Sequence, residues 1–281
     1  MLAVPEMPNA ALAATASAAE QKPLIELAHV GVTFQTKRGD PVVAVDDFNL
    51  TINKEEIFSL CGPSGCGKST VVRMLAGLLK PTSGDIWIGG GARARGFSEV
   101  AIVFQRPTLL PWSSVINNVL YPVRVLRRVT AADRTRAMEL LDLVGLADMA
   151  ESMPNELSGG MQQRAAIARS LILDPKILLM DEPFGALDAL TREDLQLDLL
   201  DIHASTRKTI LLVTHSISEA VLLSDRVAVM SARPGRLQDL IDIDIAKPRS
   251  HETAAVPAFL DYSKRIRDDI FGPRAKREIT R

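Results

Sequence analysis

The chain has 281 residues, of which 47% are hydrophobic, and its 33 basic and 34 acidic side chains leave a formal net charge of −1. This length and hydrophobic content predict one large α/β domain with insertions. A charge so close to zero gives no broad basic field, so nucleic acid is not an expected partner. No run of residues approaches the roughly 20 apolar residues of a membrane-spanning helix.

The amino-terminal segment, residues 1–23, is rich in alanine but has neither a basic start nor a sustained apolar stretch. We therefore expect a flexible leader rather than a secretory signal. From residue 24 to about residue 52, apolar and polar residues alternate on both sides of a break at 37–40. This alternation predicts antiparallel strands.

The next segment reads as a buried strand, a glycine-rich loop and a helix. The loop fits the phosphate-binding pattern of Gly, four residues and Gly-Lys-Ser/Thr. Glycines let several backbone N–H groups point at one anion, and the helix start adds a partial positive charge. A glycine-rich turn without a ligand is the alternative, which the complete spacing disfavours. The predicted nucleotide-binding residues are Gly62, Pro63, Ser64, Gly65, Cys66, Gly67, Lys68, Ser69 and Thr70.

Two side chains of this loop have particular chemistry. Lys68 supplies a point charge for the β- and γ-phosphates, and the Ser69 hydroxyl can bind Mg²⁺. The two cysteines of the chain, Cys61 and Cys66, lie at the same loop, where a disulfide would distort it. Two thiols in a chain without a signal suggest a reducing compartment.

The middle of the chain changes character. A strand is expected at 100–104, and from 107 to about 156 the pattern is helical, with residues 131–141 the clearest helix. Ser158-Gly159-Gly160 then opens another helix, predicted from Met161 to about Leu173, and such an N-terminus can bind an anion. An ordinary helix cap explains Ser158 but not the double glycine. With one phosphate loop per chain, the second anion site is expected to serve a nucleotide bound by another copy.

The carboxyl-terminal half returns to alternating strands and helices, which predicts a parallel sheet. The apolar run 176–182 ends in Asp181 and Glu182, where open α/β sheets bind ligands. Asp181 can hold Mg²⁺, and Glu182 can take a proton from an attacking water. A strand that simply ends in a polar turn is the alternative. Further strands are expected at 209–214 and 227–230, then a turn at 231–236 and a helix over 258–270.

From about residue 24 to residue 248, these motifs resemble the ATPase subunit of ATP-binding cassette (ABC) transporters. The resemblance implies that Phe34 stacks on adenine, and that Gln105 helps to bind Mg²⁺ and senses the γ-phosphate. It also implies that His215 holds the γ-phosphate and Glu182 in register. The resemblance places the family signature at 157–161 and the D-loop at 185–188. Two residues depart from the family pattern: Met161 replaces a glutamine of the signature, and Gly185 replaces the commoner serine of the D-loop.

The fold that the resemblance implies is an α/β P-loop NTPase. We expect a mixed, mainly parallel core sheet, an N-terminal antiparallel β subdomain and an inserted helical subdomain. The predicted boundaries are a flexible leader at 1–23, the ATPase domain at 24–248 with the helical subdomain at about 107–160, and a C-terminal appendage at 249–281.

The segment Leu109-Leu110-Pro111-Trp112 further resembles the nitrate, sulfonate and taurine import branch. Trp112 has a simpler interpretation as a half-buried aromatic residue. The resemblance implies a magnesium-dependent ATPase that energises uptake of a small anionic solute. Its implied partners are a second copy joined by ATP, integral membrane permease subunits and, indirectly, a periplasmic or lipid-anchored solute-binding protein. Its implied place is the cytoplasmic face of the bacterial inner membrane, as a peripheral subunit.

Two alternatives remain at this point. One is a soluble ATPase of the same superfamily in DNA repair or translation, although such proteins usually carry a long coiled-coil insertion or two cassettes. The other is a regulatory or structural nucleotide-binding module without turnover. The presence of Glu182 and His215 argues against that second alternative.

Overall fold

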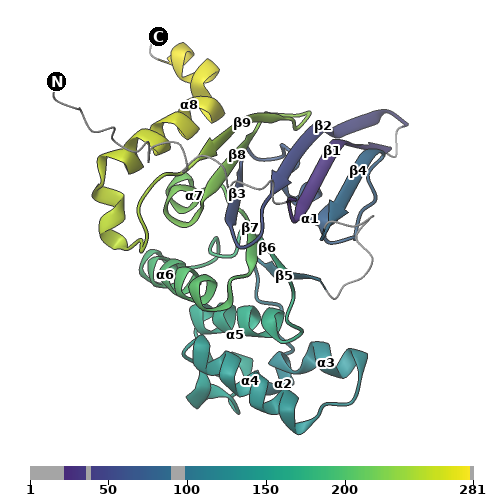
Figure 1. The fold of residues 1–281 in the computed structure, drawn as a ribbon, viewed down its shortest axis with the longest axis vertical. Coiled ribbons are helices and arrows are strands. Elements are labelled where there is room, and N and C mark those ends of the chain that lie inside the picture. Colours follow the sequence, from purple (N-terminus) through teal and green to yellow (C-terminus); the bar gives the residue numbers. More distant parts are fainter. Residues whose placement is uncertain (1–21, 36–38, 90–98, 279–281) are drawn as a thin grey trace, which may run out of the picture.

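The computed structural model describes residues 22–35, 39–89 and 99–278, and it contains two β-sheets (Figure 1). Most of the predicted leader and part of the predicted break at 37–40 lie outside the described residues. The smaller sheet is antiparallel, as expected, with the strand order β2-β1-β4. Its strands are β1 (Ile25–Gln35), β2 (Pro41–Ile52) and β4 (Ser83–Ile88).

The larger sheet has six strands in the order β5-β6-β7-β3-β8-β9. The first five run parallel and β9 is antiparallel to β8, so the mixed, mainly parallel core sheet is confirmed. β3 and β7 are buried along their whole length, which explains their continuous apolar sequences. The strands are β3 (Ile57–Cys61), β5 (Val100–Phe104), β6 (Ile177–Asp181), β7 (Thr209–Val213), β8 (Arg226–Met230) and β9 (Leu237–Asp242).

Helices cover both faces of the larger sheet. α1 (Lys68–Leu75) lies between the two sheets, and its buried side chains share one hydrophobic core with both of them (Figure 1). α6 (Ala189–Thr206) and α7 (Ile217–Leu223) pack on the other side. This sandwich places the carboxyl ends of the parallel strands at one exposed edge.

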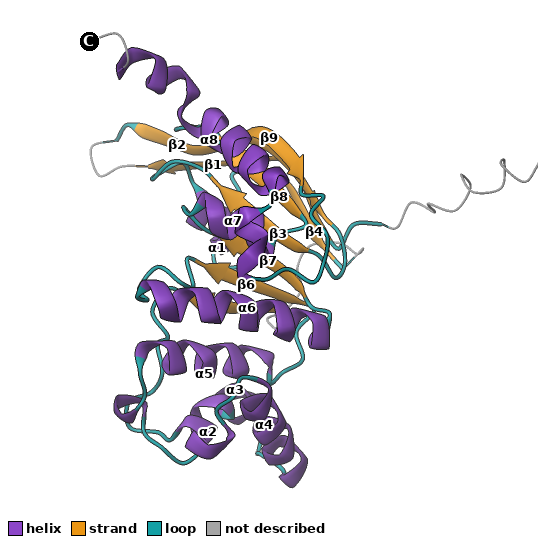
Figure 2. Ribbon diagram, turned by 90° about the vertical axis from the view of Figure 1, so that its left-hand side faces the viewer, coloured by secondary structure: helices purple, strands orange, loops and turns teal. Residues whose placement is uncertain are grey.

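The predicted helical insert forms a separate layer at one end of the molecule, where α5 lies between α6 and the other helices of the insert (Figure 2). Its clearest helix begins with a capping box, in which the side chains of Thr130 and Asp133 bond to each other's backbone N–H. α5 starts two residues before the predicted Met161, because the Ser158 hydroxyl caps it. The helices are α2 (Val115–Val119), α3 (Tyr121–Leu126), α4 (Ala131–Leu143) and α5 (Gly159–Leu171).

The carboxyl-terminal helix α8 (Pro257–Glu278) is longer than the predicted 258–270. Phe259 and Ile266 are buried in a core that also contains side chains of α7, β8 and β9. The helix is therefore attached to the domain along its first half. In the described part of the chain, no helix is both long and apolar enough to cross a membrane.

Candidate functional site

The strand order of the larger sheet gathers the predicted site residues at one edge. β6 lies between β5 and β7, and β7 lies beside β3. The residues that follow these four parallel strands are therefore neighbours, although the sequence separates them widely. Gln105 follows β5, Asp181 ends β6, His215 comes two residues after β7, and the phosphate loop follows β3.

The phosphate loop is held in shape by its glycines and by Lys68. Gly62, Gly65 and Gly67 have φ angles of 156°, 76° and 108°, which favour glycine. A Cβ on Gly67 would also lie only 2.9 Å from a methyl group of Val45. The Lys68 side chain is buried, and its Nζ donates to the carbonyl oxygens of Gly62 at 2.8 Å and of Pro63 at 3.2 Å.

Ser69 and Asp181 form the part of the site that fits a magnesium ion. The Ser69 Oγ lies 3.3 Å from the Asp181 Oδ1, so a hydroxyl and a carboxylate oxygen meet at the start of α1. Burial raises the pKa of Asp181, and the adjacent Glu182 raises it further, while the bond from Ser69 lowers it. A partly buried carboxylate of this kind is stabilised by a cation. Mg²⁺ prefers oxygen ligands and typically uses one or two carboxylates with substrate phosphates.

Glu182 and His215 form a second pair beside the first. The Nδ1 of His215 lies 3.3 Å from the Oε2 of Glu182. Glu182 has a φ of 50°, and its N–H donates to the Val213 carbonyl of the neighbouring strand at 2.9 Å. The Glu182 side chain lines the same pocket as the phosphate loop. A carboxylate held by an imidazole there can accept a proton.

Phe34 shares this pocket with the phosphate loop and Glu182. Its side chain is 42% exposed on β1, so it is not a core residue. The pocket has a volume of about 410 Å³ and is open to solvent. It is lined by Phe34, Val42, Ala44, Ser64, Gly65, Gly67, Lys68, Ser69, Thr70, Glu182 and Arg233. An aromatic ring, a phosphate-binding loop and an acid thus converge on one cavity.

Gln105 lies beside the D-loop rather than in this pocket. Its Nε2 is 2.9 Å from the position that a Cβ on Gly185 would take. Glycine at position 185, where the family has serine more often, therefore leaves room for the Gln105 amide. The described contacts do not bring Gln105 to Ser69 and Asp181, so its part in binding Mg²⁺ stays a prediction.

Ser158, Gly159 and Gly160 lie apart from the nucleotide pocket of their own chain. The Ser158 Oγ accepts a hydrogen bond from the Met161 N–H at 3.3 Å. Gly160 is buried, and a Cβ there would overlap the methyl group of Thr191 at the start of α6. Ser158 and Gly159 remain exposed at the N-terminus of α5.

The sequence reasoning missed two side chains next to the site. Glu219 is buried, and the Thr214 hydroxyl donates to it at 2.5 Å, directly before His215. The spacing Ser216-x-x-Glu219 is a capping-box signal that could have indicated this residue. Arg233 lines the pocket from the loop after β8. The sequence indicated only a turn there.

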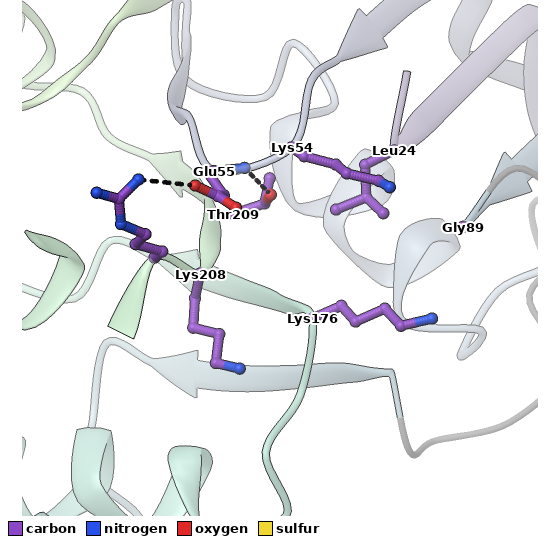
Figure 3. A pocket seen from close by; sticks show the side chains of 8 residues that line it. Leu24, Lys54, Glu55, Gly89, Lys176, Lys208 and Thr209 are labelled. Carbon is purple, nitrogen blue, oxygen red and sulfur yellow. Dashed lines mark hydrogen bonds and ion pairs between the residues drawn. The ribbon is translucent and has the colours of Figure 1, made fainter. Parts of the chain in front are cut away.

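A second pocket, of about 250 Å³, lies at the opposite edge of the larger sheet (Figure 3). It is rich in basic side chains, but several of them face acids. Lys176 is 2.5 Å from Glu99, and Lys208 is 2.7 Å from Asp174. These charges are compensated, and the pocket lies at the amino ends of the parallel strands, whereas open α/β sheets bind ligands at the carboxyl ends. We therefore do not assign nucleotide binding to this pocket.

Comparison with known proteins agrees with this geometry. The profile of the family described as ABC transporter matches residues 45–185. The nitrate import ATP-binding protein NrtD of Synechococcus elongatus is 42% identical over 226 residues, covering 79% of this chain and 82% of that protein. The taurine import ATP-binding protein TauB of Rhizobium johnstonii is 42% identical over 250 residues, covering 87% and 95%.

A solved structure is also similar. It is the dimeric, post-hydrolysis state of the ATP-binding cassette MJ0796 bound to ADP and Pi. It superposes with a TM-score of 0.68 at 31% identity, and the match covers 79% of this chain and all of that chain. The P-loop NTPase fold is thereby confirmed, and ATP with Mg²⁺ is the cofactor pair expected of such a cassette. The chain belongs to the ABC transporter family, as one of its ATP-hydrolysing cassettes.

Proposed function

We propose that this cassette energises uptake of a small anionic solute, of the nitrate, sulfonate or taurine type, through a membrane permease. The observation that carries the ATP-driven step of this proposal is the pocket that joins Phe34, the phosphate loop and Glu182. The names of the relatives support the branch, and the exposed Trp112 supports the permease. The soluble alternative in DNA repair or translation has no such support.

Each site residue except Gln105 has a role that its position supports. Phe34 stacks on adenine, and the backbone from Gly65 to Thr70 cradles the phosphates, while Lys68 neutralises their charge. Ser69, Asp181 and Gln105 would hold Mg²⁺, which stabilises negative charge on the β- and γ-phosphates when bound. Glu182 accepts a proton from the attacking water, and His215, 3.3 Å away, orients the Glu182 carboxylate.

A second copy would complete each site. The N-terminus of α5 lies outside the pocket of its own chain, yet Ser158 and Gly159 are exposed and free to meet a phosphate of a partner. Mixing Ser158→Arg with Lys68→Ala tests this arrangement. Heterodimers then contain one site with both defects and one with neither, so ATPase activity should return. In an ATP-bound Glu182→Gln dimer, a cysteine at position 158 should also crosslink to a cysteine placed at Ser64 of the other copy, because Ser64 is exposed in the pocket; no crosslink would contradict the arrangement.

The permease would dock at a groove on the helical layer. The residues that line this groove come shortly after Gln105 in the sequence and include Trp112 and Tyr121. The groove has a volume of about 480 Å³. The Trp112 side chain is 75% exposed, so the alternative of a half-buried aromatic residue is wrong. The full lining is Leu110, Trp112, Ser113, Ser114, Asn117, Tyr121, Arg124 and Val125.

The signature helix α5 is connected to the chain segment between Gln105 and this groove. The Gln163 amide donates to the Phe104 carbonyl at 3.1 Å. The Arg169 guanidinium donates to the carbonyls of Pro107 at 2.8 Å and Thr108 at 2.9 Å. Movement of α5 would therefore be transmitted to the groove, which supports a coupling role.

Uptake in a strain that lacks this gene tests the proposal. Wild-type protein should restore uptake of labelled nitrate, taurine or an alkanesulfonate, and Glu182→Gln should not. Trp112→Ala should lose uptake while the purified chain still hydrolyses ATP. Leu260→Ala is the matched control, because Leu260 is 61% exposed on α8 and does not line the groove. Unchanged uptake of all three solutes on deletion would contradict the assigned branch.

A further inference from the structure

The loop 231–236 between β8 and β9 is hydrogen-bonded to strand β2 beside the nucleotide pocket. The Gly235 N–H donates to the Ala44 carbonyl, and the Gly235 carbonyl accepts from the Asp46 N–H, both at 3.0 Å. A side chain at position 235 would overlap the Cys66 carbonyl of the phosphate loop. Glycine thus lets this loop approach both β2 and the phosphate loop closely.

Hydrogen bonds within the loop 231–236 also hold its two ends together. The Ser231 N–H donates to the Arg236 carbonyl at 2.9 Å, and the Ser231 Oγ donates to the Pro234 carbonyl at 3.0 Å. Arg236 forms an ion pair with Asp46 on β2. These bonds determine the backbone position from which the Arg233 side chain extends.

Arg233 extends into the nucleotide pocket. Its Nε and Nη2 each lie 3.4 Å from the Gly65 carbonyl, a long contact that leaves most of its N–H groups available. Phe34 and Lys68 line the same pocket. Within the part of the chain that the structure describes, Arg233 is in no ion pair, whereas Arg236 of the same loop is. A guanidinium without an ion-pair partner at the rim of a phosphate-binding pocket can donate charged hydrogen bonds to an anionic ligand.

We propose that Arg233 binds the phosphate chain of the nucleotide, as a second cation beside Lys68. This inference rests on the nucleotide pocket proposed above. The Arg233 guanidinium contacts the phosphate loop at Gly65. Phe34 lies in the part of the pocket that is assigned to the adenine base. Arg233 therefore contributes to affinity for di- and triphosphates, and contributes less for a monophosphate.

Calorimetric titration of the full chain with ATP, ADP and AMP tests the inference. Arg233→Gln should raise the Kd for ATP and ADP on the order of tenfold, the lower end of what a charged hydrogen bond gives at an exposed site. Arg233→Lys should recover part of this loss. Arg207→Gln is the control, because it removes the same charge from a residue at the basic pocket of Figure 3.

Three outcomes would overturn the assignment to phosphate. The first is a Kd for ATP within twofold of the wild type in Arg233→Gln, with Lys68→Ala still losing binding. The second is an equal loss for AMP, which would place the contact at the base or ribose. The third is an equal loss in Arg207→Gln, which would indicate net charge alone. If Lys68→Ala also left the ATP affinity unchanged, the proposed pocket itself would be wrong.

Discussion

Replacing Arg249 should destabilise the domain strongly, although this residue is remote from the chemistry. Arg249 is 7% exposed, and its guanidinium makes six hydrogen bonds to backbone carbonyls. The shortest, to Ser224, is 2.6 Å. The accepting carbonyls belong to the end of α7 and to the segment after β9, namely Val221, Leu222, Ser224, Ile243 and Ile245.

The magnitude follows from what Arg249→Met leaves behind. Methionine fills much of the aliphatic volume but donates no hydrogen bond, so carbonyls at the C-terminus of α7 lose their partner and a favourable charge. Summing six charged hydrogen bonds at about 1.5–3 kcal/mol each would overshoot, because burying the guanidinium also has a cost. Consistent with that cost, burial lowers the pKa of Arg249. Each buried carbonyl left without a donor costs about 1–3 kcal/mol, so two or more such carbonyls give a loss of about 3–5 kcal/mol.

Urea denaturation measures this loss as a lower midpoint at an unchanged slope. We expect a decrease of about 3–5 kcal/mol in the free energy of unfolding for Arg249→Met. Arg249→Lys should lose less, because three donors remain. Arg207→Met is the matched control, since that guanidinium is exposed and should change stability by less than about 0.5 kcal/mol. A decrease below 0.5 kcal/mol for Arg249→Met would refute the reasoning.

Three further predictions concern the site. Glu182→Gln should lower turnover on the order of 10²–10⁴-fold while ATP binding persists, and wild-type hydrolysis would contradict its role as the base. Phe34→Ala should weaken ATP binding by about 1–3 kcal/mol; a lower melting temperature with unchanged affinity would indicate a packing role instead. Burial raises the pKa of Glu219, so this group favours the folded state below its unfolded pKa, and that contribution is lost as pH rises through the folded pKa. The stability of Glu219→Gln relative to wild type, measured by urea denaturation, should therefore rise as the pH increases above the ordinary glutamate pKa of about 4.3, and a difference that stays constant would contradict this.

Much of the site could be predicted from the sequence because its chemistry is local. The glycines from Gly62 to Gly67 and the adjacent Lys68 act through neighbouring backbone, so their spacing alone indicates a phosphate loop. The acids at 181–182 are likewise indicated by the apolar strand before them. Helix ends were less predictable. The Ser158 hydroxyl and backbone packing, rather than hydrophobic periodicity, determine where α5 begins.

What only the tertiary structure decided depends on contacts between distant segments. The order β5-β6-β7-β3 brings Asp181 to Ser69 and His215 to Glu182, and periodicity within one strand carries no information about its neighbours in a sheet. Arg233 appeared only as part of a turn, and its place in the pocket follows from the docking of Gly235 against β2 and Cys66. Residue types and their spacing thus determined the kind of chemistry, whereas nonlocal packing determined which side chains meet to carry it out.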